Sequence, residues 1–326
     1  MFVWPLAKRS SNEVILKRSA QRAQRVNIVV VDQQANNIFQ KPQAKRSSSE
    51  AILKSRAQQA RDAHAAAHAD FRLAVCMLAS GSKGNAIYIS DGKTALLIDA
   101  GLSGIKIERR LASRGLDPQQ LQGIIVSHEH SDHVQGVGVL SRRFKLPVYI
   151  SRKTAAAAQQ IGNPHGTVFF KCGSPFQVKD LRIHPFSLSH DASDPAGFTI
   201  QSNGLKLGIA TDLGIASSVV KQHLKGCSAL ILEANHDPDM LINGPYPWPL
   251  KQRIQGRSGH LSNDTSRTLL EELVHDKLEH VILAHLSETN NTPRKALLAF
   301  EPLLSRAGAR LHVATQDECG DIIYLR

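Results

Sequence analysis

The residues with the clearest capacity for chemistry lie in one short stretch, GIIVSHEHSDHVQG. Three imidazoles and two carboxylates occur there within residues 128–133. His128 and His130 are two apart, so their side chains point to the same side of an extended segment, whereas Asp132 and His133 are adjacent and diverge. Because imidazole nitrogens and carboxylate oxygens are common zinc ligands, the spacing predicts a divalent metal site. A polar loop with incidental histidines is the weaker interpretation.

The elements around this stretch place it at the end of a strand. The apolar, β-branched run 124–126 predicts a buried strand that ends at Ser127. The apolar spacing over residues 134–143 predicts a helix directly after it. The cluster therefore lies on a loop at the carboxyl end of a strand, where α/β proteins usually hold ligands.

Further polar residues end or follow other predicted strands in the same way. They are Asp99 in LLIDAGL, His190 in FSLSHDASD, Asp212 in GIATDLG and His285 in VILAHLS. Because all four share this position, the set is stronger evidence for a common site than any single residue is. His184 lies inside a predicted strand, so we expect it to be structural.

Turn and cap signals define the neighbouring elements. Asp91-Gly92 and Asn203-Gly204 each predict a tight hairpin turn. Residues 104–114 and 151–160 have helical patterns, and Ser151 is the expected cap of the second helix.

The HEHSDH sequence resembles the metal-binding motif of the metallo-β-lactamase superfamily. This resemblance implies an α/β layered fold, an αββα sandwich of two mixed β-sheets flanked by helices, with hydrolase activity. It also implies two divalent ions, with Zn, Mn or Fe as open choices. In the implied assignment one ion is held by His128, His130 and His190, the other by Asp132, His133 and His285, and Asp212 bridges them. Asp99 is implied to orient the metal loop from behind the ligands.

Several longer motifs resemble the YycJ/WalJ-like group of bacterial proteins in that superfamily. They are SHDA at 189–192, LEANHD at 232–237, GHLSN at 259–263 and HLSETNN at 285–291. The resemblance covers residues 73–326 and implies a 5′-to-3′ exonuclease that acts on DNA, with RNA left open. The implied mechanism is attack on phosphorus by a hydroxide shared between two ions. The catalytic assignment is Asp132, Asp212 and His260, with His260 protonating the leaving oxygen.

Two regions offer substrate contacts. The turn ASGSKGN contains Ser82 and Asn85 and either surrounds a phosphate or is simply a glycine-rich hairpin. Lys251 and Arg253, close to Tyr246 and Trp248, offer positive charge and a stacking surface for a nucleic-acid strand. An ordinary amphipathic helix explains this second region equally well. Three further polar residues lie just beyond a predicted strand and either flank the site or have a structural hydrogen-bonding role, namely Glu233, Asn235 and His236.

The front of the chain differs from the rest. Residues 1–72 contain 13 basic and 5 acidic side chains, which is +8 of the total net charge of +12. They also contain an imperfect repeat, AKRSSNEVILK at 7–17 and AKRSSSEAILK at 44–54. Few large apolar residues occur there, so we expect a disordered basic extension without a catalytic role. A targeting-like segment or upstream sequence translated from a misplaced start are the open alternatives.

Composition sets the remaining expectations. The four cysteines are far apart and form no CxxC pair, which favours free thiols in a reducing cytoplasm. No apolar run approaches the roughly 18 residues that a membrane span needs. A hydrolase of a cyclic phosphodiester, thioester or lactam, or a non-catalytic metal-binding protein, are the alternative functions. The oligomeric state cannot be derived from the sequence.

Overall fold

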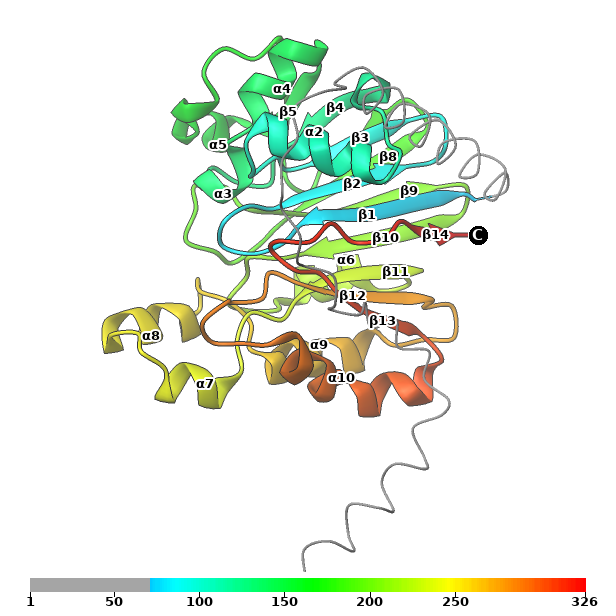
Figure 1. The fold of residues 1–326 in the computed structure, drawn as a ribbon. Helices are drawn as coiled ribbons and strands as arrows, with labels where there is room; N and C mark the ends of the chain where they lie inside the picture. The colour runs from blue at the N-terminus through cyan, green and yellow to red at the C-terminus, as the bar shows by residue number, and fades with distance from the viewer. Residues whose placement is uncertain (1–70) are drawn as a thin grey trace, which may run out of the picture. The chain divides into compact units, whose positions relative to one another are not determined.

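The computed structural model describes residues 71–326. The repeat and almost all of the predicted extension lie outside the described residues. The described part contains two seven-stranded sheets, with helices on the outer side of each (Figure 1). The first sheet has the strand order β14-β1-β2-β3-β4-β5-β6. Its strands are β1 Leu73–Ala79, β2 Ala86–Ser90, β3 Ala95–Ile98, β4 Leu121–Ile125, β5 Pro147–Ser151, β6 Gly166–Phe170 and β14 Ile323–Leu325.

The second sheet has the order β13-β12-β11-β10-β9-β8-β7. Its strands are β7 Phe176–Val178, β8 Leu181–Ser187, β9 Ala196–Ser202, β10 Leu205–Ala210, β11 Ala229–Glu233, β12 His280–Ala284 and β13 Arg310–Val313. Both sheets are mixed. Strands β3 to β6 are parallel in the first sheet, and β10 to β13 are parallel in the second.

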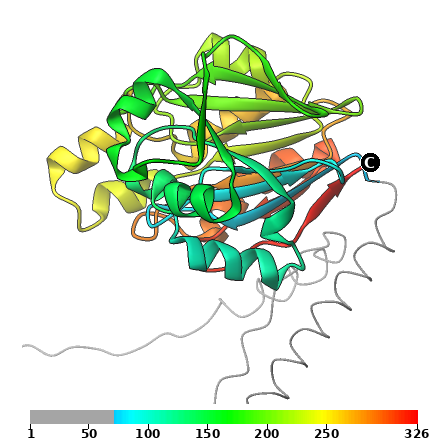
Figure 2. The same ribbon diagram turned by 90° about the horizontal axis from the view of Figure 1, so that it is seen from above.

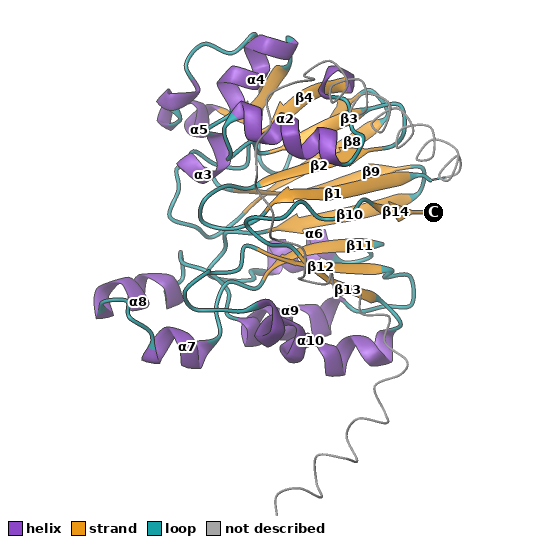
Figure 3. Ribbon diagram, in the orientation of Figure 1, coloured by secondary structure: helices purple, strands orange, loops and turns teal. Residues whose placement is uncertain are grey.

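The helices connect these strands (Figure 3). They are α2 Gly104–Ser113, α3 Ser131–Val134, α4 Val137–Phe144, α5 Arg152–Ala157, α6 Ser218–Leu224, α7 Pro238–Asn243, α8 Trp248–Gln255, α9 Asn263–Leu273 and α10 Pro293–Ala307, with 3-10 turns at Pro118–Gln120 and Gln159–Ile161. In residues 71–326, no helix has both the length and the apolar character needed to cross a bilayer.

Three apolar cores hold the layers together. The central core lies between the sheets and includes Val75 and Ile89 from one sheet and Phe198 and Ile200 from the other. A second core packs α2 and α4 onto the first sheet, and a third packs α6, α9 and α10 onto the second. Burial of apolar side chains on both faces of each sheet is what a four-layer arrangement requires. The expected αββα architecture is therefore confirmed.

The local predictions agree with the structure except at one helix. Ser151 caps α5, because its side chain accepts a hydrogen bond from the Thr154 N–H, although α5 ends at Ala157. The single helix predicted over 134–143 is interrupted between α3 and α4. Gly136 N–H donates to the Ala100 carbonyl at 2.7 Å, and a Cβ at Gly136 would lie 2.3 Å from the Leu102 carbonyl oxygen. This close contact with the β3–α2 loop fixes the break.

Candidate metal centre

Three histidines form the first polar group. His128 and His130 follow β4, and His190 follows β8. The Nδ1 atom of His130 lies 3.1 Å from His128 Nε2 and 3.3 Å from His190 Nε2. Three imidazole nitrogens therefore converge on one point, as the superfamily resemblance implied.

A second group lies beside the first and contains Asp132, His133 and His285. Asp132 and His133 belong to the short helix α3, and His285 follows β12 of the other sheet. His133 Nε2 is 3.5 Å from Asp132 Oδ2, and His285 Nε2 is 3.9 Å from the same oxygen. The two sheets thus contribute to one group.

Asp212 follows β10 and lies between these histidines. Its Oδ2 is 3.5 Å from His133 Nε2, and its Oδ1 is 3.3 Å from His285 Nε2. Potential ligand atoms of His128, His133 and Asp212 also lie within 4.8 Å of one another. The structure therefore brings all seven predicted ligands together, with Asp212 in a central position.

The chemistry of this cluster suits divalent cations. Asp212 Oδ2 and His285 Nε2 are buried without a hydrogen-bond partner among the described residues, although such groups are normally satisfied. A cation between them would satisfy both. Nitrogen-rich and mixed nitrogen–oxygen sets are ordinary surroundings for Zn, Mn or Fe.

Electrostatics support the same interpretation. Burial alone would lower the pKa of His133, but the carboxylates of Asp212 and Asp99 raise it well above the ordinary value. Burial also opposes the charged form of His285, yet Asp212 and the nearby carboxylates raise its pKa to about 10. Burial would raise the pKa of Asp212, but His285 and His133 hold it well below the usual range. The second group therefore attracts positive charge strongly.

Three residues that end strands here share an uncommon backbone conformation. Asp99, Asp212 and His285 have φ angles of 59°, 63° and 57°, in the left-handed region. Such backbone strain is found preferentially at functional sites, where the surroundings compensate for it. The Asp99 N–H donates to the Ile125 carbonyl at 2.8 Å, and the His285 N–H donates to Ser80 Oγ at 2.7 Å.

Asp99 lies behind the metal loop, as its predicted role requires. Its carboxylate accepts hydrogen bonds from the Ser127 N–H at 2.8 Å and the Ser127 hydroxyl at 2.7 Å. His133 Nδ1 lies 2.8 Å from Asp99 Oδ2. This contact fixes the imidazole so that Nε2 faces the second group.

Comparison with known proteins agrees with this geometry. Residues 94–286 match the family described as the beta-lactamase superfamily domain. Exodeoxyribonuclease YycJ of Bacillus anthracis is 39% identical over 235 residues, which cover 71% of this chain and 89% of the relative. The chain belongs to the metallo-β-lactamase superfamily. Exodeoxyribonuclease WalJ of Streptococcus pneumoniae is 35% identical over 236 residues, which cover 71% of this chain and 88% of that protein.

A solved structure of the superfamily has the same fold. The metallo-beta-lactamase fold protein YhfI from Bacillus subtilis matches with a TM-score of 0.62, over 77% of this chain and 99% of that one. At 15% identity this likeness concerns the fold alone. The family, the fold class and the hydrolase class expected from the sequence are confirmed by these comparisons together.

Glu233 is a buried residue beside the cluster whose role the sequence left open between flanking the site and a structural contact. It ends β11, and its side chain is fully buried. Its Oε1 lies 2.8 Å from His260 Nδ1 and 2.9 Å from His285 Nδ1. Backbone N–H groups of Asp212, Leu213 and Leu261 also donate to the carboxylate. Both oxygens therefore hold neighbouring groups in place, and the carboxylate also lies within a possible ligand group with Asp212, His260 and His285.

The pKa of Glu233 agrees with this role. Burial alone would raise the pKa of the carboxyl, but the charges and hydrogen bonds of His260 and His285 lower it to about 2. A carboxylate directly after the apolar run ALIL was the available signal in the sequence. That signal placed Glu233 just beyond a strand but did not distinguish a residue of the site from one with a structural hydrogen-bonding role.

Glu129 was also overlooked inside the histidine motif. Its Oε1 accepts hydrogen bonds from the N–H and the hydroxyl of Ser193, both at 2.7 Å. This contact joins the loop of His128 and His130 to the loop of His190.

The predicted substrate contacts have different surroundings. Ser82 is exposed, whereas the Asn85 amide is buried against Asp132 and His133. Lys251 is buried, and its ammonium group donates to the carbonyls of Ile242 at 2.7 Å and Gly244 at 2.8 Å. The expectation that Lys251 offers its charge to a nucleic acid is therefore corrected, because the α7–α8 segment needs this group.

Arg253 and His260 retain surroundings that suit their predicted roles. Arg253 is exposed and pairs with Asp191 at 2.7 Å, directly after His190 in the chain. The His260 ring centroid lies 5.2 Å from that of His190 and 5.1 Å from that of His285. The α7–α8 pair extends beyond the ends of the strands, as Figure 2 shows in yellow.

Asn235 and His236 are buried within the structure. The Asn235 amide donates to the His285 carbonyl at 2.9 Å, and the His236 carbonyl accepts the Asn263 N–H at 2.8 Å. Both residues therefore support the loops around the cluster. His184 lies in β8 beside the His223 ring, 4.5 Å between centroids, in agreement with the expected structural role.

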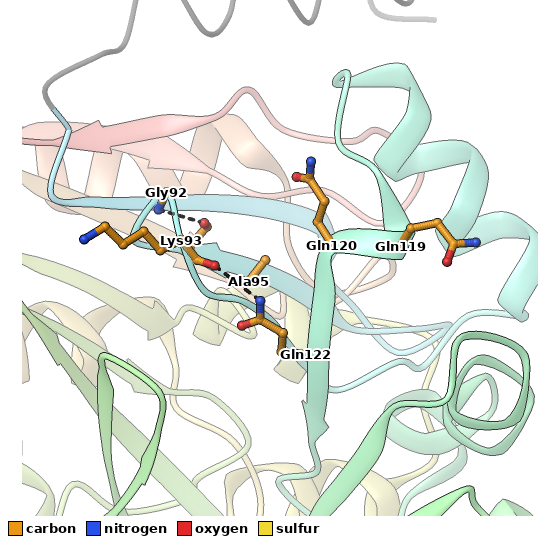
Figure 4. Close-up of a pocket in the computed structure, with 7 residues that line it drawn as sticks. Gly92, Lys93, Ala95, Gln119, Gln120 and Gln122 are labelled. Atoms are coloured by element: carbon orange, nitrogen blue, oxygen red, sulfur yellow. Dashed lines mark hydrogen bonds between the residues drawn. The ribbon is translucent and has the colours of Figure 1, made fainter.

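A shallow cavity lies elsewhere on the domain. It is lined by residues that include Lys93, Gln119 and Gln122, near the starts of β3 and β4 (Figure 4). The metal cluster lies at the opposite ends of those strands. None of the predicted site residues lines this cavity.

Proposed function

We propose that the protein is a metal-dependent nuclease that removes nucleotides from DNA in the 5′-to-3′ direction. The observation that carries the proposal is the convergence of seven histidine and aspartate side chains from both sheets into two adjoining groups. The relatives named exodeoxyribonucleases, at 39% and 35% identity, support DNA as the substrate.

The proposed metal assignment follows these two groups. His128, His130 and His190 would hold one ion, the second group would hold another, and Asp212 would contact both. Two bound divalent ions lower the pKa of a water molecule and neutralise charge on the phosphate. The role of the chain is to hold these ligands rigidly. Asp99 contributes through its contact with His133, and Glu233 through its contact with His285.

His260 is the proposed proton donor to the leaving oxygen. Its Nδ1 faces Glu233, which fixes the orientation of the ring and directs Nε2 away from the carboxylate. The side chain is 21% exposed, so substrate can reach it, while Glu233 is completely buried. Cleavage of the phosphorus–oxygen bond leaves an alkoxide, and the proton transferred from His260 would produce the 3′-hydroxyl.

The α7–α8 pair is the proposed contact for the DNA strand. Trp248 is 56% exposed at the start of α8, where its ring can stack on a base. Arg253 lies at the other end of α8 and next to the His190 loop through Asp191. The Ser189 hydroxyl also donates to the Arg257 carbonyl at 2.8 Å, which connects this segment to the cluster.

A labelled-DNA assay tests the proposal. The purified protein, supplied with Mn²⁺ or Zn²⁺, is incubated with duplex DNA labelled at either the 5′ or the 3′ end. We expect immediate release of single nucleotides from the 5′ label and progressive shortening of 3′-labelled strands. His128→Ala should reduce this activity at least about 100-fold, because the first group loses a ligand.

Two small substrates separate the alternative functions. Bis-p-nitrophenyl phosphate reports phosphodiesterase chemistry, and a thioester reports the competing hydrolase class. Thioester turnover without DNA cleavage would contradict the nuclease proposal. Metal binding without turnover of any of these substrates would instead favour the non-catalytic alternative.

A further inference from the structure

The loop between β1 and β2 contacts both sheets at the metal cluster. This Ser80–Asn85 loop, ASGSKGN in the sequence with Ala79, begins in the first sheet. Ser80 Oγ accepts the His285 N–H at 2.7 Å, at the end of β12 in the second sheet. The Ser80 N–H donates to the Thr315 carbonyl at 3.1 Å. Ser80 is 2% exposed, so water does not replace these contacts readily.

The other end of the loop contacts Asp132 and His133. The Asn85 N–H donates to the Asp132 carbonyl at 2.7 Å. Asn85 Nδ2 lies 3.2 Å from Asp132 Oδ2 and 3.0 Å from His133 Nε2. The amide orientation is fixed by Gly81, because Asn85 Oδ1 accepts the Gly81 N–H at 2.8 Å and Nδ2 donates to the Gly81 carbonyl at 3.0 Å.

The loop is braced independently of the metal ligands. Gln316, 7% exposed, accepts the Lys83 N–H at 2.6 Å and donates to the Gly84 carbonyl at 3.0 Å. Close packing against the β3–α2 loop adds to this, since the Gly101 N–H donates to the Asn85 carbonyl at 2.8 Å and a Cβ at Gly101 would lie 2.7 Å from the Asn85 backbone nitrogen. The loop is therefore a fixed support.

The side-chain contacts of this loop involve only one of the two ligand groups. Ser80 contacts His285, and Asn85 contacts Asp132 and His133, which together are the three members of the second group. Because His133 Nε2 would give its lone pair to an ion, the supporting contact of Asn85 is the one to the Asp132 carboxylate. Among residues 71–326, neither side chain has a hydrogen bond to His128, His130 or His190. The first group has its own support, the Glu129–Ser193 contact.

We propose that Ser80 and Asn85 are positioning residues for the second group and set its metal affinity, without setting that of the first group. This inference rests on the metal assignment in the proposed function. Ser80 holds the His285 backbone in its left-handed conformation. Asn85 fixes the Asp132 carboxylate, which lies on a helix of only four residues. The glycine-rich turn thus serves the metal ligands, in place of the phosphate contact considered for Asn85.

The test measures metal affinity in the full-length protein without substrate. Ser80→Ala and Asn85→Ala are compared with the parent by competition against a chromophoric chelator and by metal analysis at buffered free Zn²⁺. The parent should bind two ions. Each variant should bind one with unchanged affinity and the other about 10–100-fold more weakly, as is usual when a group that supports a metal ligand is removed.

Matched controls are Ser174→Ala and Asn163→Ala, which remove exposed side chains of the same types in other loops. Both should retain the two parental affinities. If Asn85→Ala does not fold, Ser80→Ala alone decides the question, because it removes a single acceptor. Unchanged affinity for both ions, or equal weakening of both in a folded variant, would overturn the inference. A parent that binds two ions but does not cleave DNA would refute the proposed function and leave this inference standing.

Discussion

Glu233 connects two histidines that have different proposed tasks. One carboxylate oxygen faces Nδ1 of both His260 and His285. His285 then directs Nε2 toward Asp212, while His260 remains partly open to solvent. A single buried acid therefore orients both a proposed metal ligand and a proposed proton donor. The difference in exposure separates their roles, since a proton donor must reach the substrate.

Replacement of His260 tests this division at the level of one side chain. His260→Ala should lower kcat on DNA by about 10²–10⁴-fold, because the leaving oxygen loses its proton donor. Metal stoichiometry should remain that of the parent, because His260 lies outside the two assigned ligand sets. Steady-state kinetics and metal analysis of the same preparation provide the check. Loss of metal in parallel with activity would instead identify His260 as a ligand.

The ends of the parallel strands determine where the chemistry lies. β4, β10 and β12 end one to three residues before His128, Asp212 and His285, and β11 ends at Glu233 beside them. Apolar strand patterns followed by a histidine or an acid predicted polar residues at strand ends, and the superfamily resemblance implied the set of seven ligands. The supporting loops were harder to predict, because the partner of Ser80 is more than 200 residues away in the chain. Such contacts depend on how the two sheets face each other.

The α7–α8 pair also contains contacts that could not be predicted from the sequence. Lys251 and Arg253 are both basic and two residues apart, so the sequence treats them alike. In the structure, Lys251 points inward to two carbonyl groups, while Arg253 stays exposed. Only the fold of the Gly244–Pro247 turn against α8 distinguishes the two positions.

Substitution of these two residues should therefore have opposite effects. Lys251→Met keeps the length of the side chain but leaves two carbonyls without their charged donor, which should lower the free energy of unfolding by about 1.5–3 kcal/mol. Arg253→Ala breaks an exposed ion pair and should change it by less than about 1 kcal/mol. DNA binding should show the reverse order, with Arg253→Ala reducing the slope of log K against log salt by about one. Chemical denaturation and salt-dependent binding measure the two quantities, and equal effects of both substitutions on stability would contradict this assignment.

At the scale of the whole molecule, the paired sheets bring distant parts of the sequence together. His128 and His285 are 157 positions apart, yet potential ligand atoms of both lie in adjoining groups around Asp212. Three apolar cores fix the four layers. Most of the net positive charge, +8 of +12, lies in residues 1–72 and precedes the catalytic domain. The proposed active site therefore depends on the stacking of the sheets and not on net charge.

Diffraction from crystals grown with Mn²⁺, recorded on both sides of the manganese absorption edge, tests the central claim most directly. The account predicts two anomalous peaks, one bonded to His128, His130 and His190 and the other to Asp132, His133 and His285, with Asp212 in contact with both. A well-ordered cluster without a peak, or metal bound only at other residues, would contradict it.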